Sequence, residues 1–133
     1  MKESRRKVAL ATLPTASTAI TSDVELASDG ASASLGFDFD RDGVIYRSGV
    51  RFSKVRAIQW RAEGQCSVWH IEGAYDTVIE VEGSSWVSEL ERSQSQRPNK
   101  PWTIRHFMLF IDSAGCYEFA AESFEILPEI RRS

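Results

Sequence analysis

The sequence has little cysteine and no long hydrophobic run. Two cysteines, Cys66 and Cys116, are too few for the disulfide framework of a small secreted domain, and a chain of 133 residues does not need one. We expect two buried thiols in a reducing cytoplasm, with one disulfide between them as the alternative. No apolar stretch approaches the ~20 residues of a membrane span, so a membrane location is not expected.

Basic charge is also in short supply, since 19 acidic residues outnumber 16 basic ones and the net charge is -3. Proteins that bind nucleic acid usually carry a basic excess that neutralises phosphates, so this balance argues against nucleic acid as the partner. The apolar content of 42% and the aromatic content of 11% predict a packed core in place of disorder.

The two histidines, His70 and His106, are the only residues available to a histidine-based mechanism. With Cys66 and Cys116 they suggest a zinc site. The hairpin pairing described below puts His106 and Cys116 roughly 16 Å apart along a strand, whereas zinc ligands lie ~2.0–2.3 Å from one ion. A Ser-centred nucleophile motif and a Gly-rich phosphate loop are missing. We therefore assign no metal, no cofactor and no catalytic residue.

The N-terminal third begins with a basic segment that becomes rich in Thr, Ala and Ser. This composition predicts a flexible arm over residues 1–22, followed by a single globular domain over residues 23–133. A twin-arginine export signal and a misassigned start are the alternatives. The apolar stretch from Val8 to Leu13 has only six residues and is closed by Pro14, which is short for an export signal.

The most informative stretch runs from Trp102 to Phe124 and predicts a β-hairpin, because two apolar, aromatic-rich runs flank turn residues. A four-residue turn from Asp112 to Gly115 would pair Ile111 with Cys116. The same register pairs Leu109 with Glu118 and Phe107 with Ala120. Both faces are mostly apolar, so we expect the hairpin to be covered on both sides.

The remaining elements predict an α+β fold that is predominantly antiparallel β. We expect one twisted sheet or partly closed barrel, with one short helix at about 85–95 packed on it, for which Ser84 and Ser85 offer caps. Residues 24–26 and 35–39 alternate as a strand pair, and 67–71 and 75–81 are expected to be strands. Residues 53–63 fit a strand, with a helix as the alternative.

Residues 38–43 open like a calcium-binding EF-hand loop, with aspartates at Asp38, Asp40 and Asp42. The twelfth position of that loop is Gly49 where a bidentate glutamate is needed. The Asp42-Gly43 pair instead favours a tight hairpin turn, since these residues adopt a positive φ at little cost.

Two sets of candidate site residues emerge. Asp76, Glu80 and Glu82 form an acidic stripe on one face of a strand, and Trp86 and Trp102 supply aromatic anchors. These five residues are the predicted binding surface for a basic protein partner.

The alternative is a pocket between sheet and helix that uses His70, His106 and Glu118 in a small-molecule-binding protein or enzyme. Glu118 has apolar neighbours along the chain, so it must be paired or protonated if it is buried. An ion pair with Arg105 or an edge position would explain it without a function.

A run of residues also carries a resemblance: Trp102-x3-His106, then Met108 to Ser113, Gly115-Cys116-Tyr117-Glu118, preceded by Trp69-His70, Tyr75-Asp76 and Ser85-Trp86. Over residues 50–128 the chain resembles small uncharacterised bacterial β-rich proteins, some of which accompany polymorphic toxins as immunity proteins. The resemblance implies a domain that acts by binding, without a cofactor. We accordingly expect an interaction protein, with a basic toxin as a possible partner and the pocket hypothesis as the alternative.

Overall fold

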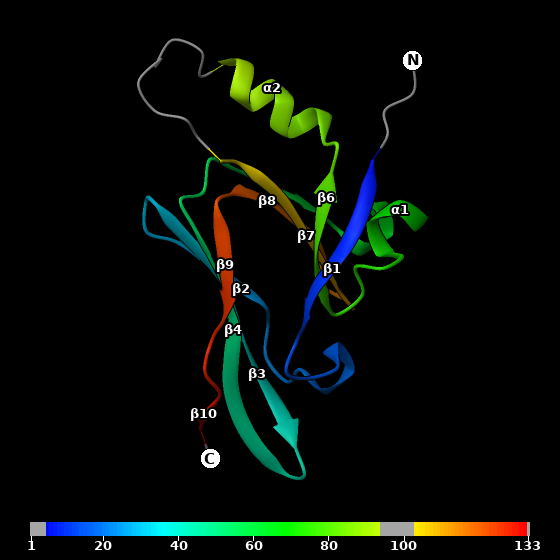
Figure 1. Ribbon diagram of the computed structural model, residues 1–133. Coiled ribbons are helices and arrows are strands. Elements are labelled where there is room, and N and C mark those ends of the chain that lie inside the picture. The colour runs from blue at the N-terminus through cyan, green and yellow to red at the C-terminus, as the bar shows by residue number, and fades with distance from the viewer. Residues whose placement is uncertain (1–4, 94–102, 133) are drawn as a thin grey trace.

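The computed structural model describes residues 5–93 and 103–132, whose strands form two antiparallel sheets (Figure 1). The first sheet has the order β1 (Arg6–Thr12), β6 (Thr77–Glu82), β7 (Arg105–Ile111), β8 (Gly115–Ala121), β5 (Ala57–Arg61). The second has the order β10 (Ile130–Arg131), β4 (Val44–Ser53), β3 (Ser32–Arg41), β2 (Glu25–Ser28), and β9 (Ser123–Ile126) also pairs with β4. The predicted α+β class, mainly antiparallel, is confirmed, but the described strands form two sheets and not the single twisted sheet or partly closed barrel that was expected.

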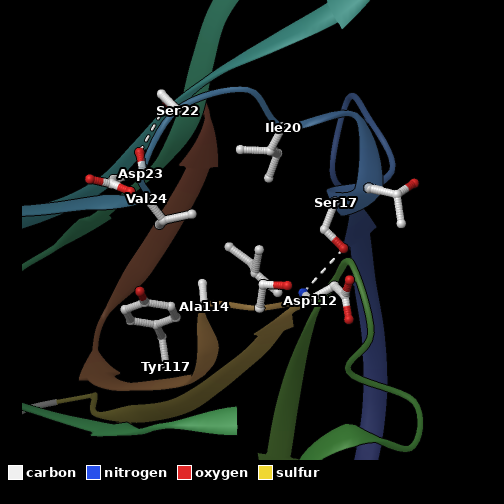
Figure 2. A pocket seen from close by; sticks show the side chains of 11 residues that line it. Ser17, Ile20, Ser22, Asp23, Val24, Asp112, Ala114 and Tyr117 are labelled. Atoms are coloured by element: carbon white, nitrogen blue, oxygen red, sulfur yellow. Dashed lines mark hydrogen bonds between the residues drawn. The ribbon is translucent and has the colours of Figure 1, made fainter.

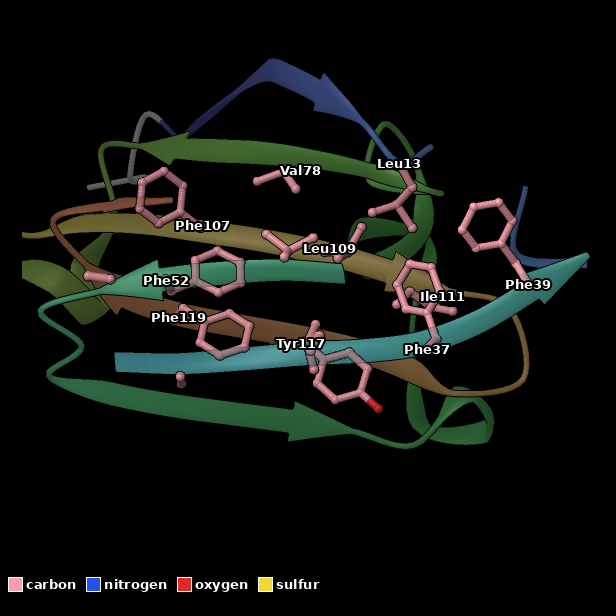
Figure 3. Close-up of a cluster of buried hydrophobic side chains, with 14 residues drawn as sticks. Leu13, Phe37, Phe39, Phe52, Val78, Phe107, Leu109, Ile111, Tyr117 and Phe119 are labelled. Atoms are coloured by element: carbon pink, nitrogen blue, oxygen red, sulfur yellow. The ribbon is translucent and has the colours of Figure 1, made fainter. Parts of the chain in front are cut away.

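The main core lies between the two sheets, because alternate residues of each central strand point to the facing sheet. Phe52 of β4 and Phe119 of β8 stack across the interface with ring centroids 3.9 Å apart and an interplanar angle of 11°. The central strands contribute Leu35, Phe37, Phe39, Val50, Phe52, Phe107, Leu109, Ile111, Tyr117 and Phe119 to this core (Figure 3).

A second, smaller core covers the outer face of the first sheet. It is built on Met108, Phe110 and Cys116 of the β7–β8 hairpin, and Trp69 of the short helix α1 (Val68–Ile71) packs against it. Helix α2 (Ser85–Ser93) follows β6 at the other end of this face (Figure 1). The expectation that the hairpin is covered on both faces is confirmed, and the described part of α2 confirms the predicted helix as far as residue 93.

The β7–β8 turn has three residues, Asp112 to Ala114, and not the predicted four. Ile111 pairs with Gly115 instead of with Cys116. Gly115 has a φ of 110°, and a Cβ at this position would lie 2.3 Å from the carbonyl oxygen of Arg61 on β5. Glycine is therefore required as the first residue of β8 as well as for the turn.

This one-residue correction changes which side chains share a face. Leu109 pairs with Tyr117 and not with Glu118, so the predicted pairs are wrong throughout the hairpin, Phe107 with Ala120 included. Because side chains alternate along a strand, Glu118 moves from the face of Leu109 to the face of His106. That exchange determines the polar network described below.

Two local predictions are confirmed. Asp42 and Gly43, with φ angles of 54° and 82°, form the two-residue turn between β3 and β4. The segment over 53–63 contains strand β5, which pairs with β8, as the strand interpretation predicted. Lys54, in the short connection between β4 and β5, has a positive φ of 54°.

Two other local predictions are wrong. A flexible arm was expected over residues 1–22, but Arg6 to Thr12 form strand β1, which pairs with β6. Residues 68–71, expected to be a strand, form the single turn of α1. Both differences depend on contacts between distant residues, since Lys7 Nζ donates to the carbonyl oxygens of Trp69 and Glu72. In the described ranges we find no helix long and apolar enough to cross a membrane.

Candidate functional site

An open pocket of about 670 Å³ lies at one end of the space between the two sheets. One wall is the connection from β1 to β2, which includes the 3-10 helix η1 (Ser17–Ala19), and the opposite wall is the β7–β8 turn (Figure 2). The pocket thus combines the segment that crosses from one sheet to the other with the end of the central hairpin.

Hydrogen bonds hold the η1 wall against the first sheet. Pro14 follows β1 and ends its pairing, since proline cannot donate to a strand ladder. The Ser17 backbone N–H donates to Asp76 Oδ2 at 2.9 Å, and the Asp112 N–H donates to Ser17 Oγ at 3.1 Å. Ser17 therefore joins η1 both to the loop before β6 and to the β7–β8 turn.

The other end of the connection is fixed to the second sheet. Ile20 forms a bridge with Phe39, and the Thr21 N–H donates to the Asp38 carbonyl oxygen at 2.9 Å. The Asp38 N–H donates in turn to Ser22 Oγ at 2.8 Å. Because both ends are fixed by hydrogen bonds to the two sheets and their connecting loops, the wall of the pocket is preformed.

The lining of the pocket is mainly polar and includes two carboxylates, while Ile20, Val24, Ile111 and Ala114 supply its apolar part. Figure 2 shows Ile20 and Val24 facing Ala114, with the carboxylates of Asp23 and Asp112 on opposite sides. Within residues 5–93 and 103–132, neither of these carboxylates forms an ion pair. The site therefore offers uncompensated negative charge beside an apolar surface.

Two aromatic residues continue the pocket toward β5. Tyr117 forms part of the lining, and burial raises the pKa of its phenol, an effect partly offset by a hydrogen bond with Trp60. Trp60 pairs with Tyr117 across β5 and β8, donates from Nε1 to the Ala114 carbonyl oxygen at 2.9 Å, and is 56% exposed. An exposed tryptophan fixed beside a pocket is a typical anchor for a binding partner.

The predicted acidic stripe is largely engaged within the protein. Glu80 accepts from Arg105 at 2.8 Å, Glu82 accepts from Arg6 at 2.6 Å, and Asp76 accepts from Ser17. The ion pairs compensate Glu80 and Glu82, whereas Asp76 accepts only from a backbone N–H and its Oδ1 is buried without a hydrogen-bond partner. The two ion pairs weaken the case for this stripe as a partner surface.

The aromatic anchors predicted with the stripe also lie elsewhere. Trp86 of α2 packs edge-on against His106, with ring centroids 5.0 Å apart. Trp102 lies outside the described residues.

The alternative set is only partly brought together. His106 Nε2 and Glu118 Oε1 are 2.7 Å apart in a buried pair, and His106 Nδ1 is 2.7 Å from Ser84 Oγ. His70 is not part of this network, because its Nδ1 accepts from the Ser67 N–H at 3.0 Å. Burial lowers the pKa of His70. Arg105, the partner considered for Glu118, pairs with Glu80 instead.

Sequence reasoning missed Asp23, Asp112 and Trp60 as members of one site, and it interpreted Ser84 only as a helix cap. Asp112 was interpreted only as a turn residue, and Trp60 only as part of a strand. For Ser84, the local signal is its place directly after Gly83 and before the predicted helix, where serine is a favoured N-cap. The remaining contacts depend on long-range pairing that no local pattern shows.

The described residues contain no group of three or more His, Cys, Asp or Glu side chains placed to hold a metal ion. Two aspartates of the segment that opens like an EF-hand loop have partners within the β3–β4 hairpin. Asp38 pairs with Arg47, and Asp40 Oδ1 accepts from the Gly43 N–H at 3.1 Å. No protein-family model matches the chain, and no curated protein or solved structure is significantly similar to it.

Proposed function

We propose that the protein is an interaction protein that receives a basic side chain of its partner in the pocket between η1 and the β7–β8 turn. The observation that carries the proposal is the pair of carboxylates, Asp23 and Asp112, which lie on either side of the apolar side chains of Ile20 and Val24 without an ion-pairing cation among the described residues. Lysine and arginine have the complementary shape, since an apolar stem carries the charged head.

The partner's side chain would pack its stem against Ile20 and Val24 and place its charge near the rim. Trp60 and Tyr117 would add aromatic contact area, and a cation beside an aromatic ring gains further electrostatic attraction. This arrangement moves the binding site for a basic partner from the predicted stripe to the end of the two sheets. A toxin neutralised by such capture would be the most specific form of the proposal, as the resemblance to immunity proteins implies.

The test uses hexa-arginine as the probe and a hexa-citrulline peptide as its uncharged counterpart, at about physiological ionic strength. Binding is followed by tryptophan fluorescence and by calorimetry. Hexa-arginine should bind and hexa-citrulline should not. The double variant D23N/D112N should bind at least about tenfold more weakly, because a hydrogen bond to a charged group contributes ~1.5–3 kcal/mol.

Two control variants separate this site from general electrostatic attraction. D42N removes one carboxylate charge at the β3–β4 turn, where asparagine also tolerates a positive φ, and E82Q removes one from the predicted stripe, so that the two together match the charge removed in D23N/D112N. Both should bind hexa-arginine like the unmodified protein. Equal weakening in all the variants, or no binding by the unmodified chain, would reject the pocket as the site.

A further inference from the structure

A buried chain of three polar side chains lies outside the pocket, on the outer face of the first sheet. Ser84 contacts His106 and His106 contacts Glu118, each at 2.7 Å, and the three residues are only 8%, 6% and 8% exposed. They come from three elements: the start of α2, strand β7 and strand β8. The interaction function proposed above makes no use of them.

The hydrogen-bonding pattern shows which atom of each of these three side chains donates and which accepts. An ionised carboxylate only accepts, so the His106 hydrogen belongs on Nε2, facing Glu118. Nδ1 is then the acceptor for the Ser84 hydroxyl. A hydroxyl, an imidazole that can take its proton, and a carboxylate that orients the imidazole are the parts of an activated serine nucleophile.

The backbone places Ser84 where such a nucleophile can act. Strand β6 leads to α2 through Gly83 and Ser84 alone, and Gly83 has a φ of 75°. Ser84 and His106 line an open pocket of about 230 Å³, whose apolar part includes Val87 and Ile104 and whose charged part is mainly acidic, with Glu80, Glu82, Glu91 and Arg105. The start of a nine-residue helix adjoins the hydroxyl, and its partial positive charge favours negative charge developing on a bound oxygen. Trp86 packs against the imidazole and fixes its plane.

We propose that Ser84 is the nucleophile of an acyl-transfer site for short, uncharged esters. Ser84 Oγ bonds to the carbonyl carbon while its proton moves to His106 Nδ1, and Glu118 holds the imidazolium that forms. The carbon–oxygen bond to the alcohol breaks, and the alcohol leaves with that proton. Water then attacks the acyl group, passes its proton through His106 to Ser84, and releases the carboxylic acid. The small pocket at Ser84 limits the acyl group to a small one.

The test is covalent labelling of the full chain with a fluorophosphonate, followed by peptide mass spectrometry. The Ser84 oxygen bonds to phosphorus and fluoride leaves, so the modified residue is identified directly. We expect the label on Ser84. S84N should lose it while keeping the helix cap, since asparagine is as good an N-cap as serine. S93A, at the other end of the same helix and outside the pocket, should be labelled like the unmodified protein.

Glu118 is a positioning residue in this scheme, and its role has a separate readout. In E118Q the maximal labelling rate should fall at least about 100-fold, within the range for lost general-base assistance. The probe concentration that gives half of that rate should stay the same. The proposal is overturned if the folded protein, checked by circular dichroism, is not labelled on Ser84, or if E118Q is labelled at the full rate.

Discussion

The His106–Glu118 pair predicts a double-mutant cycle with an unusual order of stabilities. His106→Phe leaves the buried Glu118 carboxylate without its partner, which should cost about 3–5 kcal/mol. Glu118→Met leaves the His106 Nε2 hydrogen without an acceptor, at a cost of about 1–3 kcal/mol. Both residues lie on the outer face of adjacent strands and neither is exposed enough for water to replace the lost partner.

The double variant H106F/E118M removes both polar groups and should be more stable than H106F alone. The remaining cost is chiefly one hydrogen bond to Ser84, about 1 kcal/mol. Urea unfolding monitored by circular dichroism gives the free energy of unfolding for the four proteins. Additive effects of the two substitutions, or a double variant less stable than H106F, would refute the buried pair as the structure shows it.

Two further predictions concern the two cores. Phe52→Ala should lower the free energy of unfolding by about 3–5 kcal/mol, because the fully buried ring stacks on Phe119 between the sheets. Urea unfolding measures this loss, and a loss of less than about 1 kcal/mol would contradict the prediction. Burial raises the pKa of Cys116 to about 12 and also raises that of Cys66. Iodoacetamide at pH 8 should therefore modify the partly exposed Cys66 first and Cys116 only after unfolding, and mass spectrometry of the modified peptides checks this order. Since the unfolded Cys116 thiol ionises first, its contribution to stability should fall as the pH rises from about 9 to 12.

The sequence was informative where the signal is local. Asp42-Gly43 predicted the β3–β4 turn because few residues adopt two successive positive φ angles. Serines before Trp86 predicted the start of α2, and the aromatic runs on both sides of Asp112 predicted the central hairpin. In each case neighbouring residues determine the backbone.

The site was harder to predict because it depends on one residue of register and on distant contacts. A turn of four residues and one of three fit Asp112 to Gly115 equally well, yet only the shorter turn puts Glu118 beside His106. The acidic pocket brings Asp23 together with the hairpin turn through a crossing between sheets. Such a crossing leaves no periodic pattern in the sequence.

The pairing of β1 with β6 also bears on aggregation. An edge strand presents unpaired backbone groups on which another chain can add a strand, and charged residues at the edge oppose this. Strand β1 brings Arg6 and Lys7 to the edge of the first sheet and covers β6, whose Ile79 and Val81 are buried. A chain shortened to begin at Asp23 would make β6 the new edge and leave its backbone groups on that side without their partners in β1. The N-terminal strand therefore protects the protein from self-association through its own sheet.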